Sequence, residues 1–330
     1  MQLAGTRAIN SCKSRRKSQE IRGLSPVVDI LVFGAGAMGS FFGGILSRRN
    51  HVTLICRQEH ASAIRKSGLH IGGKTSLIAH PAVATAAARI RRADLILIST
   101  KAYDTEVAAR TLRRFGTKPI WLTLQNGLEN ASVLARTAMK VVAGITSHGV
   151  TLGRPGEVRH AGVGDTVIGG FSGVDENDVV RVRDVFEESG IHTTISPNIR
   201  RDLWLKVIVN AGINPLAALT GLRNGQLVVV PPLREAMTEL CAEAAAVARA
   251  EGFELSNREA INLTVRVARR TRENKASMLQ DIERHRRTEI DAITGAILRA
   301  ADRHGLKVPT NRLAYALVHG LERPYRPPTS

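Results

Sequence analysis

Three polar residues recur at four-residue intervals in the apolar stretch formed by residues 201–215, RDLWLKVIVNAGINP. If this stretch is helical, Lys206, Asn210 and Asn214 share one face, because residues four apart are neighbours on a helix. Asparagine is a poor helix former, since its amide competes with the backbone for hydrogen bonds. The stripe therefore suggests side chains that line a cleft, and the alternative is a solvated stripe on a core helix. A lysine in a cleft could donate a proton and stabilise a developing negative charge.

A glycine-rich loop follows the first predicted strand, residues 27–33, and precedes a helical run that extends to about residue 49. Its motif, G-x-G-x-x-G, consists of Gly34, Ala35, Gly36, Ala37, Met38 and Gly39. Between a strand and a helix, this motif typically binds a dinucleotide. The first glycine allows the turn, the second lets a pyrophosphate approach, and the third lets the helix pack closely. The helix N-terminus then faces the phosphates. The alternative is a glycine-rich structural turn.

The residue after the second predicted strand, residues 51–56, bears on the choice of cofactor. Sites that prefer NADH usually place Asp or Glu here to bind the ribose 2′-hydroxyl. This chain has Arg57 instead. An acid would repel a 2′-phosphate, whereas a guanidinium can pair with it through two hydrogen bonds. We therefore predict NADPH as the cofactor, the alternative being that Arg57 is a surface residue at the end of a strand.

The pattern of elements predicts two domains. Buried-strand patterns at residues 95–100, 120–125 and 141–147 are spaced as in an α/β fold, and residues 151–170 are interpreted as hairpins that extend the same sheet. Lys101 and Asn126 follow two of these strands, where ligands of such sheets bind. We predict an α/β Rossmann-type N-terminal domain that binds NADP (residues 27–197). An all-α C-terminal domain (residues 198–330) follows, in which the substrate binds, and a disordered basic tail (residues 1–26) precedes both.

The helical half contains several local signals. Pro215 predicts a kink in the first helix, which should end near Thr220, and Asn224-Gly225 is typical of a turn. Ser277 begins a predicted capping box. Glu289 is interpreted as the start of a helix that runs to residue 303. The remaining predicted helices cover residues 232–251, 256–272 and 310–321.

Composition argues against several classes of protein. The three cysteines show no paired spacing, which argues against a disulfide framework or a metal site. No apolar run reaches the length needed to span a bilayer, so no membrane association is predicted. The net charge of +18 would attract anionic ligands, but no aromatic-rich basic stretch indicates nucleic-acid binding. The basic tail has no apolar core of a secretory signal. We predict a cytoplasmic protein, and organellar targeting by the tail is left open.

The glycine loop, together with RDLWLKVIVNAGINPLAAL and SMLQDIERHRRTEIDAITG, resembles the ketopantoate reductase (2-dehydropantoate 2-reductase) family. The resemblance covers about residues 29–318, nearly everything except the tail. It implies an oxidoreductase that uses NADPH to reduce 2-dehydropantoate to (R)-pantoate in pantothenate and coenzyme A biosynthesis. A homodimer formed through the helical domain is a hypothesis for its assembly.

The resemblance also implies a role for each motif residue. Lys206, in the motif L-W-x-K, would be the general acid, and Glu289, in R-x-T-E-I-D, would contact both substrate and cofactor as the second catalytic residue. The implied substrate-binding residues are Asn126, Asn210, Asn214, Asn224 and Ser277. The implied cofactor-binding residues are Gly34, Ala35, Gly36, Ala37, Met38, Gly39, Arg57, Lys101, Asn126 and Glu289. Local alternatives are a helix-terminal charge for Glu289 and an N-cap for Ser277.

Two other functions fit the same fold. One is reduction of another 2-keto or 3-keto acid, since a fold constrains the chemistry of a site only loosely. The other is a non-catalytic NADPH-binding sensor, with the helical domain as a partner surface. The presence of Lys206, Asn210 and Glu289 argues against the sensor, because a sensor needs no proton donor.

Overall fold

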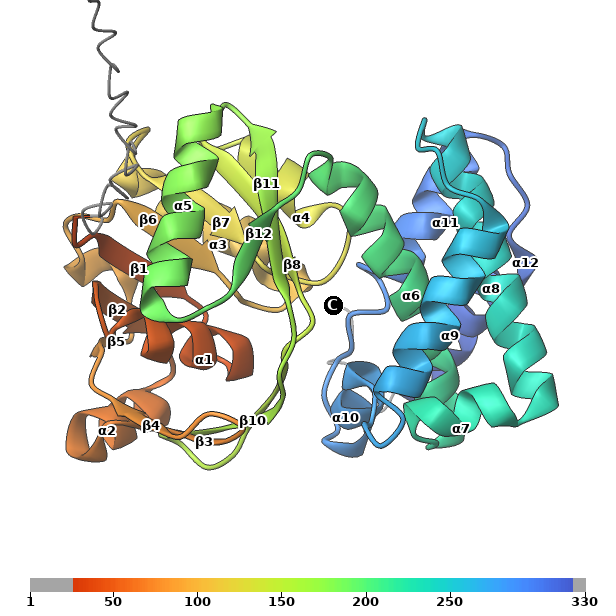
Figure 1. Cartoon of the computed structure of the whole chain (residues 1–330), viewed down its shortest axis with the longest axis horizontal. Coiled ribbons are helices and arrows are strands. Elements are labelled where there is room, and N and C mark those ends of the chain that lie inside the picture. Colours follow the sequence, from red (N-terminus) through yellow and green to blue (C-terminus); the bar gives the residue numbers. More distant parts are fainter. Residues whose placement is uncertain (1–25, 323–330) are drawn as a thin grey trace, which may run out of the picture.

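An eight-stranded sheet forms the centre of the N-terminal half of the computed structural model, which describes residues 26–322 (Figure 1). The strand order is β12-β11-β8-β7-β6-β1-β2-β5. The strands are β1 (Asp29–Phe33), β2 (His51–Ile55), β5 (Ala82–Ala84), β6 (Leu95–Ile98), β7 (Ile120–Thr123), β8 (Val141–Thr146), β11 (Thr166–Ser172) and β12 (Thr193–Ile195). The predicted tail lies outside the described residues, apart from Pro26.

The six strands from β5 to β8 are parallel, and β11 runs antiparallel to β8 at one side of the sheet. Every residue of β6 and β7 is buried, as expected for central strands with helices on both faces. On one face lie α1 (Ala37–Leu46) and α5 (Glu176–Ser189). The other face carries α3 (Thr105–Leu112) and α4 (Asn130–Ala135). The α/β Rossmann-type prediction is therefore confirmed.

A second sheet of four strands lies beside α1, with the order β4-β3-β10-β9. Its strands are β3 (Leu69–Gly73), β4 (Leu77–Ala79), β9 (Gly149–Leu152) and β10 (Glu157–Gly162). The prediction that residues 151–170 extend the main sheet is wrong for β9 and β10 and holds only for β11. The physical reason is that β3 and β4, which follow α2 (Gln58–Ser67), provide another edge, and β10 pairs in parallel with β3.

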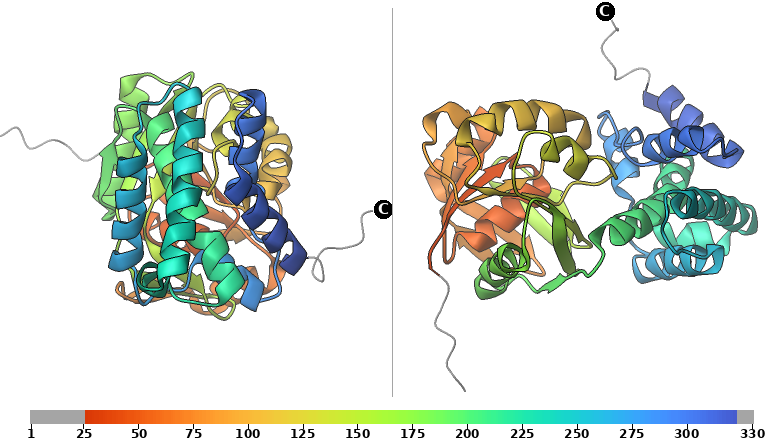
Figure 2. Two further views of the ribbon diagram at one scale, coloured as in Figure 1. Left: turned by 90° about the vertical axis from the view of Figure 1, so that its right-hand side faces the viewer. Right: turned by 90° about the horizontal axis from the view of Figure 1, so that it is seen from above.

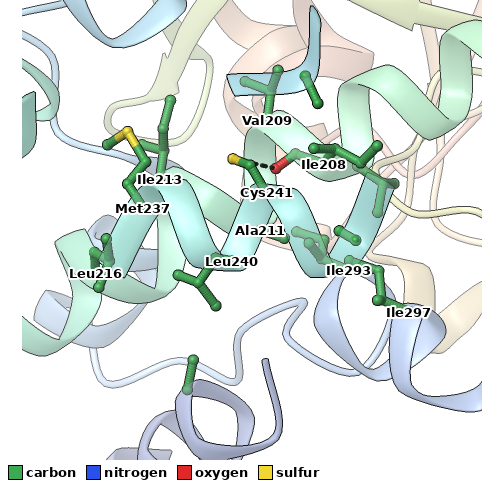
Figure 3. Packing of buried hydrophobic residues seen from close by; sticks show 14 of the residues in the cluster. Ile208, Val209, Ala211, Ile213, Leu216, Met237, Leu240, Cys241, Ile293 and Ile297 are labelled. Carbon is green, nitrogen blue, oxygen red and sulfur yellow. Dashed lines mark hydrogen bonds between the residues drawn. The ribbon is translucent and has the colours of Figure 1, made fainter. Parts of the chain in front are cut away.

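The C-terminal half consists of helices, which confirms the all-α prediction. They are α6 (Ile199–Thr220), α7 (Asn224–Val229), α8 (Pro231–Ala250), α9 (Asn257–Arg270), α10 (Ser277–Glu283), α11 (Thr294–Arg303) and α12 (Pro309–Glu322). The two halves lie side by side, and α6 leads from the sheet into the helices (Figure 2). Gly212 lets α8 and α9 approach α6, since a Cβ there would lie 2.7 Å from Cys241 Sγ and 3.0 Å from the Thr264 methyl group. The apolar core around this crossing is shown in Figure 3.

Burial explains an unusual property of α6. It is the one helix of residues 26–322 that is long and apolar enough to cross a membrane, with a mean hydropathy of 1.3, which differs from the prediction that no apolar run reaches that length. Polar residues interrupt the apolar sequence of α6, but they do not lower its mean hydropathy below the range of membrane-spanning helices. Within the protein, 72% of an apolar 18-residue segment of α6 is buried, which is the environment of a core helix.

Three local predictions in the helical half are wrong. Asn224 begins α7 instead of forming a turn, with Arg223 as the N-cap. Ser277 is the first residue of α10 and its hydroxyl caps nothing, because Ala276 occupies the N-cap position. Glu289 does not start a helix: α11 begins at Thr294, after a turn in which the Thr288 hydroxyl accepts a hydrogen bond from the Ile290 N–H. The helix α6 continues through Pro215 and ends at Thr220 as expected, where Gly221 adopts a φ of 72°.

Candidate active site

The three glycines of the loop after β1 have three different surroundings. Gly34 has a φ of 99°, and a Cβ there would lie 2.7 Å from the backbone nitrogen of Thr100. At Gly39 a Cβ would lie 2.4 Å from the Gly34 carbonyl oxygen, so only glycine lets α1 pack this closely. Gly36 has no atom within 4 Å of its Cβ position. It is the N-cap of α1, and no side chain caps the N–H groups of the first turn, which leaves them available to an anionic group.

The other residues of the loop place it next to the second strand. Ala35 donates its N–H to the carbonyl of Ile55 at 2.9 Å, and Ala37 and Met38 form the start of α1. Arg57 is exposed at the N-cap of α2, two residues after β2 ends. Its guanidinium makes no hydrogen bond or ion pair with residues 26–322. The arginine is therefore available to an anionic group that extends from the glycine loop.

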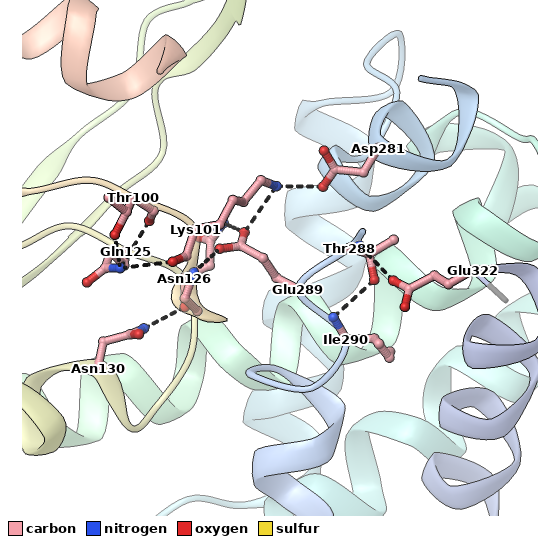
Figure 4. Close-up of polar contacts among 11 residues, drawn as sticks. Thr100, Lys101, Gln125, Asn126, Asn130, Asp281, Thr288, Glu289, Ile290 and Glu322 are labelled. Atoms are coloured by element: carbon pink, nitrogen blue, oxygen red, sulfur yellow. Dashed lines mark hydrogen bonds and ion pairs between the residues drawn. The ribbon is translucent and has the colours of Figure 1, made fainter. Parts of the chain in front are cut away.

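The carboxyl ends of β6 and β7 bring Lys101 and Asn126 to the same edge of the sheet. Gln125 joins the two loops, because its Nε2 donates to the Thr100 carbonyl at 3.0 Å (Figure 4). It also donates to the Thr105 hydroxyl at 2.9 Å. Its side chain is buried, at 6% exposed. Sequence analysis did not identify Gln125, although it lies directly before the predicted Asn126.

Glu289 extends from the helical half to this edge and binds two groups there (Figure 4). Its Oε1 accepts a hydrogen bond from the Ala102 N–H at 3.0 Å, and its Oε2 accepts one from Asn126 Nδ2 at 3.0 Å. Oε2 also lies 3.6 Å from Lys101 Nζ. The side chain of Glu289 is 8% exposed. The carboxylate therefore joins both halves of the molecule, and its position five residues before α11 does not support the helix-dipole alternative.

A second carboxylate, that of Asp281 on α10, also contacts Lys101. Its Oδ2 lies 2.6 Å from Lys101 Nζ. Burial acts to lower the pKa of Lys101, but the charges of Glu289 and Asp281 outweigh it and raise the pKa. Burial raises the pKa of Asp281, and Lys101 opposes that rise. For Lys101 the neighbouring charges outweigh burial, whereas for Asp281 burial outweighs the charge of the lysine. The 2.6 Å contact between Nζ and Oδ2 is typical of a charged pair near neutral pH. Asp281 lies within the motif SMLQD, but no sequence pattern indicates a role for it.

Lys206 approaches the same edge of the sheet from α6. Its ammonium donates to the carbonyl oxygen of Thr146, the last residue of β8, at 3.2 Å. Burial lowers the pKa of Lys206 to about 8, while the charge of Glu289 acts in the opposite direction. Thr146 contributes only a backbone carbonyl, so no side-chain pattern could have identified it. Lys206 is thus a lysine that can release its proton close to neutral pH.

The remaining predicted residues lie on three helices, α6, α7 and α10. Asn210 and Asn214 follow Lys206 on successive turns of α6, and neither amide makes a hydrogen bond within residues 26–322. Asn214 is only 5% exposed, so its amide needs a partner such as a ligand or water. Asn224 donates to the Thr271 hydroxyl at 2.8 Å, and its Oδ1 is buried without a partner among the described residues. Ser277 is exposed on α10, one turn before Asp281.

A cavity of about 160 Å³ opens at a different part of the interface between the halves. Trp204, Phe171, Phe253, Arg200 and Arg303 are among the residues that line it. None of the predicted site residues lines this cavity. We therefore assign the chemistry to the region around Lys206 and Glu289.

Two family models match the chain. The ketopantoate reductase PanE/ApbA model matches residues 30–173, and the ketopantoate reductase PanE/ApbA C-terminal model matches residues 198–322. A 2-dehydropantoate 2-reductase from Halobacterium salinarum is 39% identical over 300 residues, which cover 89% of this chain and 99% of that protein. A 2-dehydropantoate 2-reductase from Pyrococcus horikoshii is 37% identical over 296 residues, which cover 89% and 97%.

Solved structures show the same architecture. A PanE/ApbA family ketopantoate reductase from Ralstonia eutropha has a TM-score of 0.83 and 33% identity, covering 90% of this chain and 99% of that one. The ternary structure of a D-mandelate dehydrogenase with NADH and anilino(oxo)acetate has a TM-score of 0.85 and 28% identity, with the same two coverages.

The different surroundings of two loop glycines lead to a prediction. Gly36→Ala should fold normally, because no atom lies near the new methyl group, but it should weaken dinucleotide binding by at least about tenfold, since the methyl obstructs the approach of a pyrophosphate. Gly39→Ala is the matched control and should lower the melting temperature instead, because its methyl meets the Gly34 carbonyl. Fluorescence titration with NADPH and thermal melts separate the two effects. An unchanged dissociation constant in Gly36→Ala would contradict the proposed phosphate site.

Proposed function

The chain belongs to the ketopantoate reductase family, and we propose that it uses NADPH to reduce 2-dehydropantoate to (R)-pantoate, a step of pantothenate and coenzyme A biosynthesis. The main support is the 39% identity with a 2-dehydropantoate 2-reductase over nearly the whole described chain. The site geometry agrees with this reaction, because a lysine of lowered pKa and a buried carboxylate lie at the carboxyl edge of a dinucleotide-binding sheet.

The described residues fit a bound dinucleotide. Gly36 leaves room for the pyrophosphate, the first turn of α1 offers free N–H groups, and Arg57 is available for the 2′-phosphate. NADPH supplies the hydride when it is bound. Lys101 and Asn126 are proposed to hold the cofactor beside the carboxyl ends of β6 and β7.

Lys206 is proposed to be the general acid. As the C2 carbonyl carbon gains a hydride, its oxygen becomes an alkoxide that needs stabilisation and then a proton. An ammonium with a pKa of about 8 can supply both near neutral pH. Thr146 holds Nζ at the end of β8, and Glu289 favours the protonated state by its charge. Lys206 and Glu289 are therefore assigned as the catalytic pair.

The amides of α6 are proposed to bind the substrate. Asn210 and Asn214 continue the face of the helix that carries Lys206, and their amides lack protein partners within residues 26–322. Ser277 and Asn224 lie further along the helical half and are proposed to bind the polar groups remote from the ketone. In this arrangement the helical domain supplies the substrate contacts, and the sheet domain supplies the cofactor contacts.

A second candidate function follows from the D-mandelate dehydrogenase structure. That protein was solved with NADH and anilino(oxo)acetate, and its TM-score to this chain is 0.85. Its lower identity, 28% against 39% for the 2-dehydropantoate 2-reductase of Halobacterium salinarum, favours 2-dehydropantoate. Reduction of another 2-keto acid is the alternative that the substrate experiment must exclude.

The substrate assignment is tested by following NADPH oxidation with a panel of 2-keto acids. 2-Dehydropantoate should give the highest kcat/KM, at least about tenfold above pyruvate, 2-oxoisovalerate and benzoylformate, because the asparagine amides can pair with its additional hydroxyl group. If benzoylformate were preferred, the D-mandelate-type assignment would replace the present one.

The role of Lys206 is tested by two substitutions. Lys206→Ala should lower kcat by roughly 10²–10⁴, the usual contribution of general acid catalysis. NADPH affinity should change little, because the phosphates are assigned to the glycine loop. Lys206→Arg should rescue poorly, since a guanidinium keeps its charge but does not release a proton near neutral pH. Substantial rescue by Arg would indicate a purely electrostatic role, and an Ala variant within about threefold of the parent would remove Lys206 from the mechanism.

The same assignment fixes the direction of the pH dependence. Because burial lowers the pKa of Lys206 to about 8, the lysine is protonated below that pH and loses its proton above it. Single-turnover reduction should therefore be constant below about pH 8 and fall as the pH rises further, while oxidation of pantoate should increase over the same range. Lys206→Ala should show neither change.

Cofactor preference is tested at Arg57. NADPH should bind at least about tenfold more tightly than NADH, which corresponds to about 1.4 kcal/mol. Arg57→Asp should narrow or reverse this ratio, because an exposed carboxylate repels a 2′-phosphate and can accept a hydrogen bond from a 2′-hydroxyl. Titration of both cofactors against parent and variant measures the ratio. Equal affinity of the parent for the two cofactors would show that Arg57 is only a surface residue.

A further inference from the structure

The ion pair between Asp281 and Lys101 connects the helical half of the molecule to the sheet half. Asp281 lies on α10 of the helical half, and Lys101 lies three residues after β6 in the sheet half (Figure 4). Their charged atoms are 2.6 Å apart, and the side chains are 11% and 34% exposed. Lys101 is one of the proposed cofactor ligands, whereas Asp281 has no assigned role.

A second ion pair between the halves provides a comparison. Arg299 on α11 contacts Glu129 beside α4 through two hydrogen bonds of 2.7 Å and 3.1 Å. These side chains are 47% and 49% exposed, so water screens the pair and its loss exposes little new charge. In the Asp281–Lys101 pair the carboxylate is only 11% exposed and the lysine side chain 34%, so water screens this contact less. Separating the halves must break this short, partly shielded ion pair.

The Lys101 ammonium has enough donors to bind a cofactor while it stays paired. It carries three N–H groups, of which Asp281 accepts one at 2.6 Å, and Glu289 lies at a longer distance of 3.6 Å. Asp281 therefore need not be displaced when a ligand arrives. It restricts the ammonium to the interface, and any separation of the halves that would open the site must first break this ion pair.

We propose that Asp281 is a positioning residue whose ion pair with Lys101 holds the two domains together over the bound cofactor and so slows its release. This inference rests on the proposed function, because it takes Lys101 to be a cofactor ligand. It assigns Asp281 a kinetic role: the carboxylate touches neither the ketone nor the hydride, and its effect lies in how long the cofactor stays bound.

The opposite role for Asp281 predicts an opposite result. If its carboxylate competed with the cofactor for Lys101, removing its charge would free the ammonium and tighten cofactor binding. If it holds the domains together, removing its charge shortens the residence time of the cofactor. The direction of the change therefore separates the two possibilities.

The test measures NADPH dissociation by stopped-flow fluorescence, together with hydride transfer in a single turnover at saturating cofactor and 2-dehydropantoate. Asp281→Asn keeps the shape and removes the charge. It should accelerate dissociation by about tenfold, because the ion pair that opposes separation of the halves is lost, and such a change acts mainly on the off-rate. Hydride transfer should stay within about threefold of the parent, since the reacting groups remain in place.

Three further variants serve as controls. Glu129→Gln breaks the exposed ion pair between the halves and should leave NADPH dissociation unchanged. Asp281→Glu keeps the charge and should restore most of the residence time. In a Lys101→Met background, Asp281→Asn should add no further acceleration, because the two groups act as one pair. A melting temperature for each variant shows that the protein is folded.

Several results would overturn the inference. Slower or unchanged release in Asp281→Asn would do so, as would equal acceleration by Glu129→Gln, or a further acceleration in the Lys101→Met background. If Asp281→Asn slowed hydride transfer by the same factor as it accelerated NADPH dissociation, Asp281 would have a general structural role instead. If the parent protein bound no NADPH, the proposed function would fail as well; if the parent bound NADPH and Asp281→Asn had no effect, only this inference would fail.

Discussion

The carboxylate of Glu289 is the interaction on which the arrangement of this site depends. It is supplied by the helical half, yet both of its oxygens bind groups of the sheet half, the Ala102 N–H and the Asn126 amide. At 8% exposed, it is a charge that the protein must pair or solvate with hydrogen bonds. Lys101 and Lys206 provide the compensating positive charge nearby. A single buried carboxylate thereby fixes where the proposed cofactor edge, the proposed proton donor and the proposed substrate-binding helix meet.

The fold prepares each of these partners. The buried strands β6 and β7 deliver Lys101 and Asn126 to neighbouring positions, and Gln125 connects their loops. On the other side, α6 packs its apolar residues into the helical core and leaves Lys206 at the interface, where burial brings its pKa to about 8. The apolar composition of α6 leads to its burial, and this burial lowers the pKa of the proposed acid.

Sequence analysis predicted the features whose chemistry demands a residue type at a fixed spacing. The glycine loop is such a case, since a Cβ at Gly34 or Gly39 would collide with its surroundings. Features set by distant parts of the chain could not be found in this way. Asp281 lies 180 residues from Lys101, and no local pattern links them.

The same limit explains the wrong predictions. β10 pairs with β3, a strand far back in the chain, so its membership of a separate sheet is not visible in residues 151–170. The sequence pattern predicts a helix start at Glu289, but Glu289 contacts the other domain from a turn, and α11 begins at Thr294. The motif around Glu289 contains a residue that contacts the other domain, while its local structure depends on tertiary contacts.

The central claim is that the Lys206 ammonium gives its proton to the oxygen at C2 of the substrate. A crystal structure with NADP and pantoate tests this most directly. We expect Nζ of Lys206 within about 3 Å of the C2 hydroxyl oxygen, with the nicotinamide on the opposite side of that carbon. A complex in which another group binds this oxygen, and Lys206 remains on the Thr146 carbonyl alone, would contradict the account.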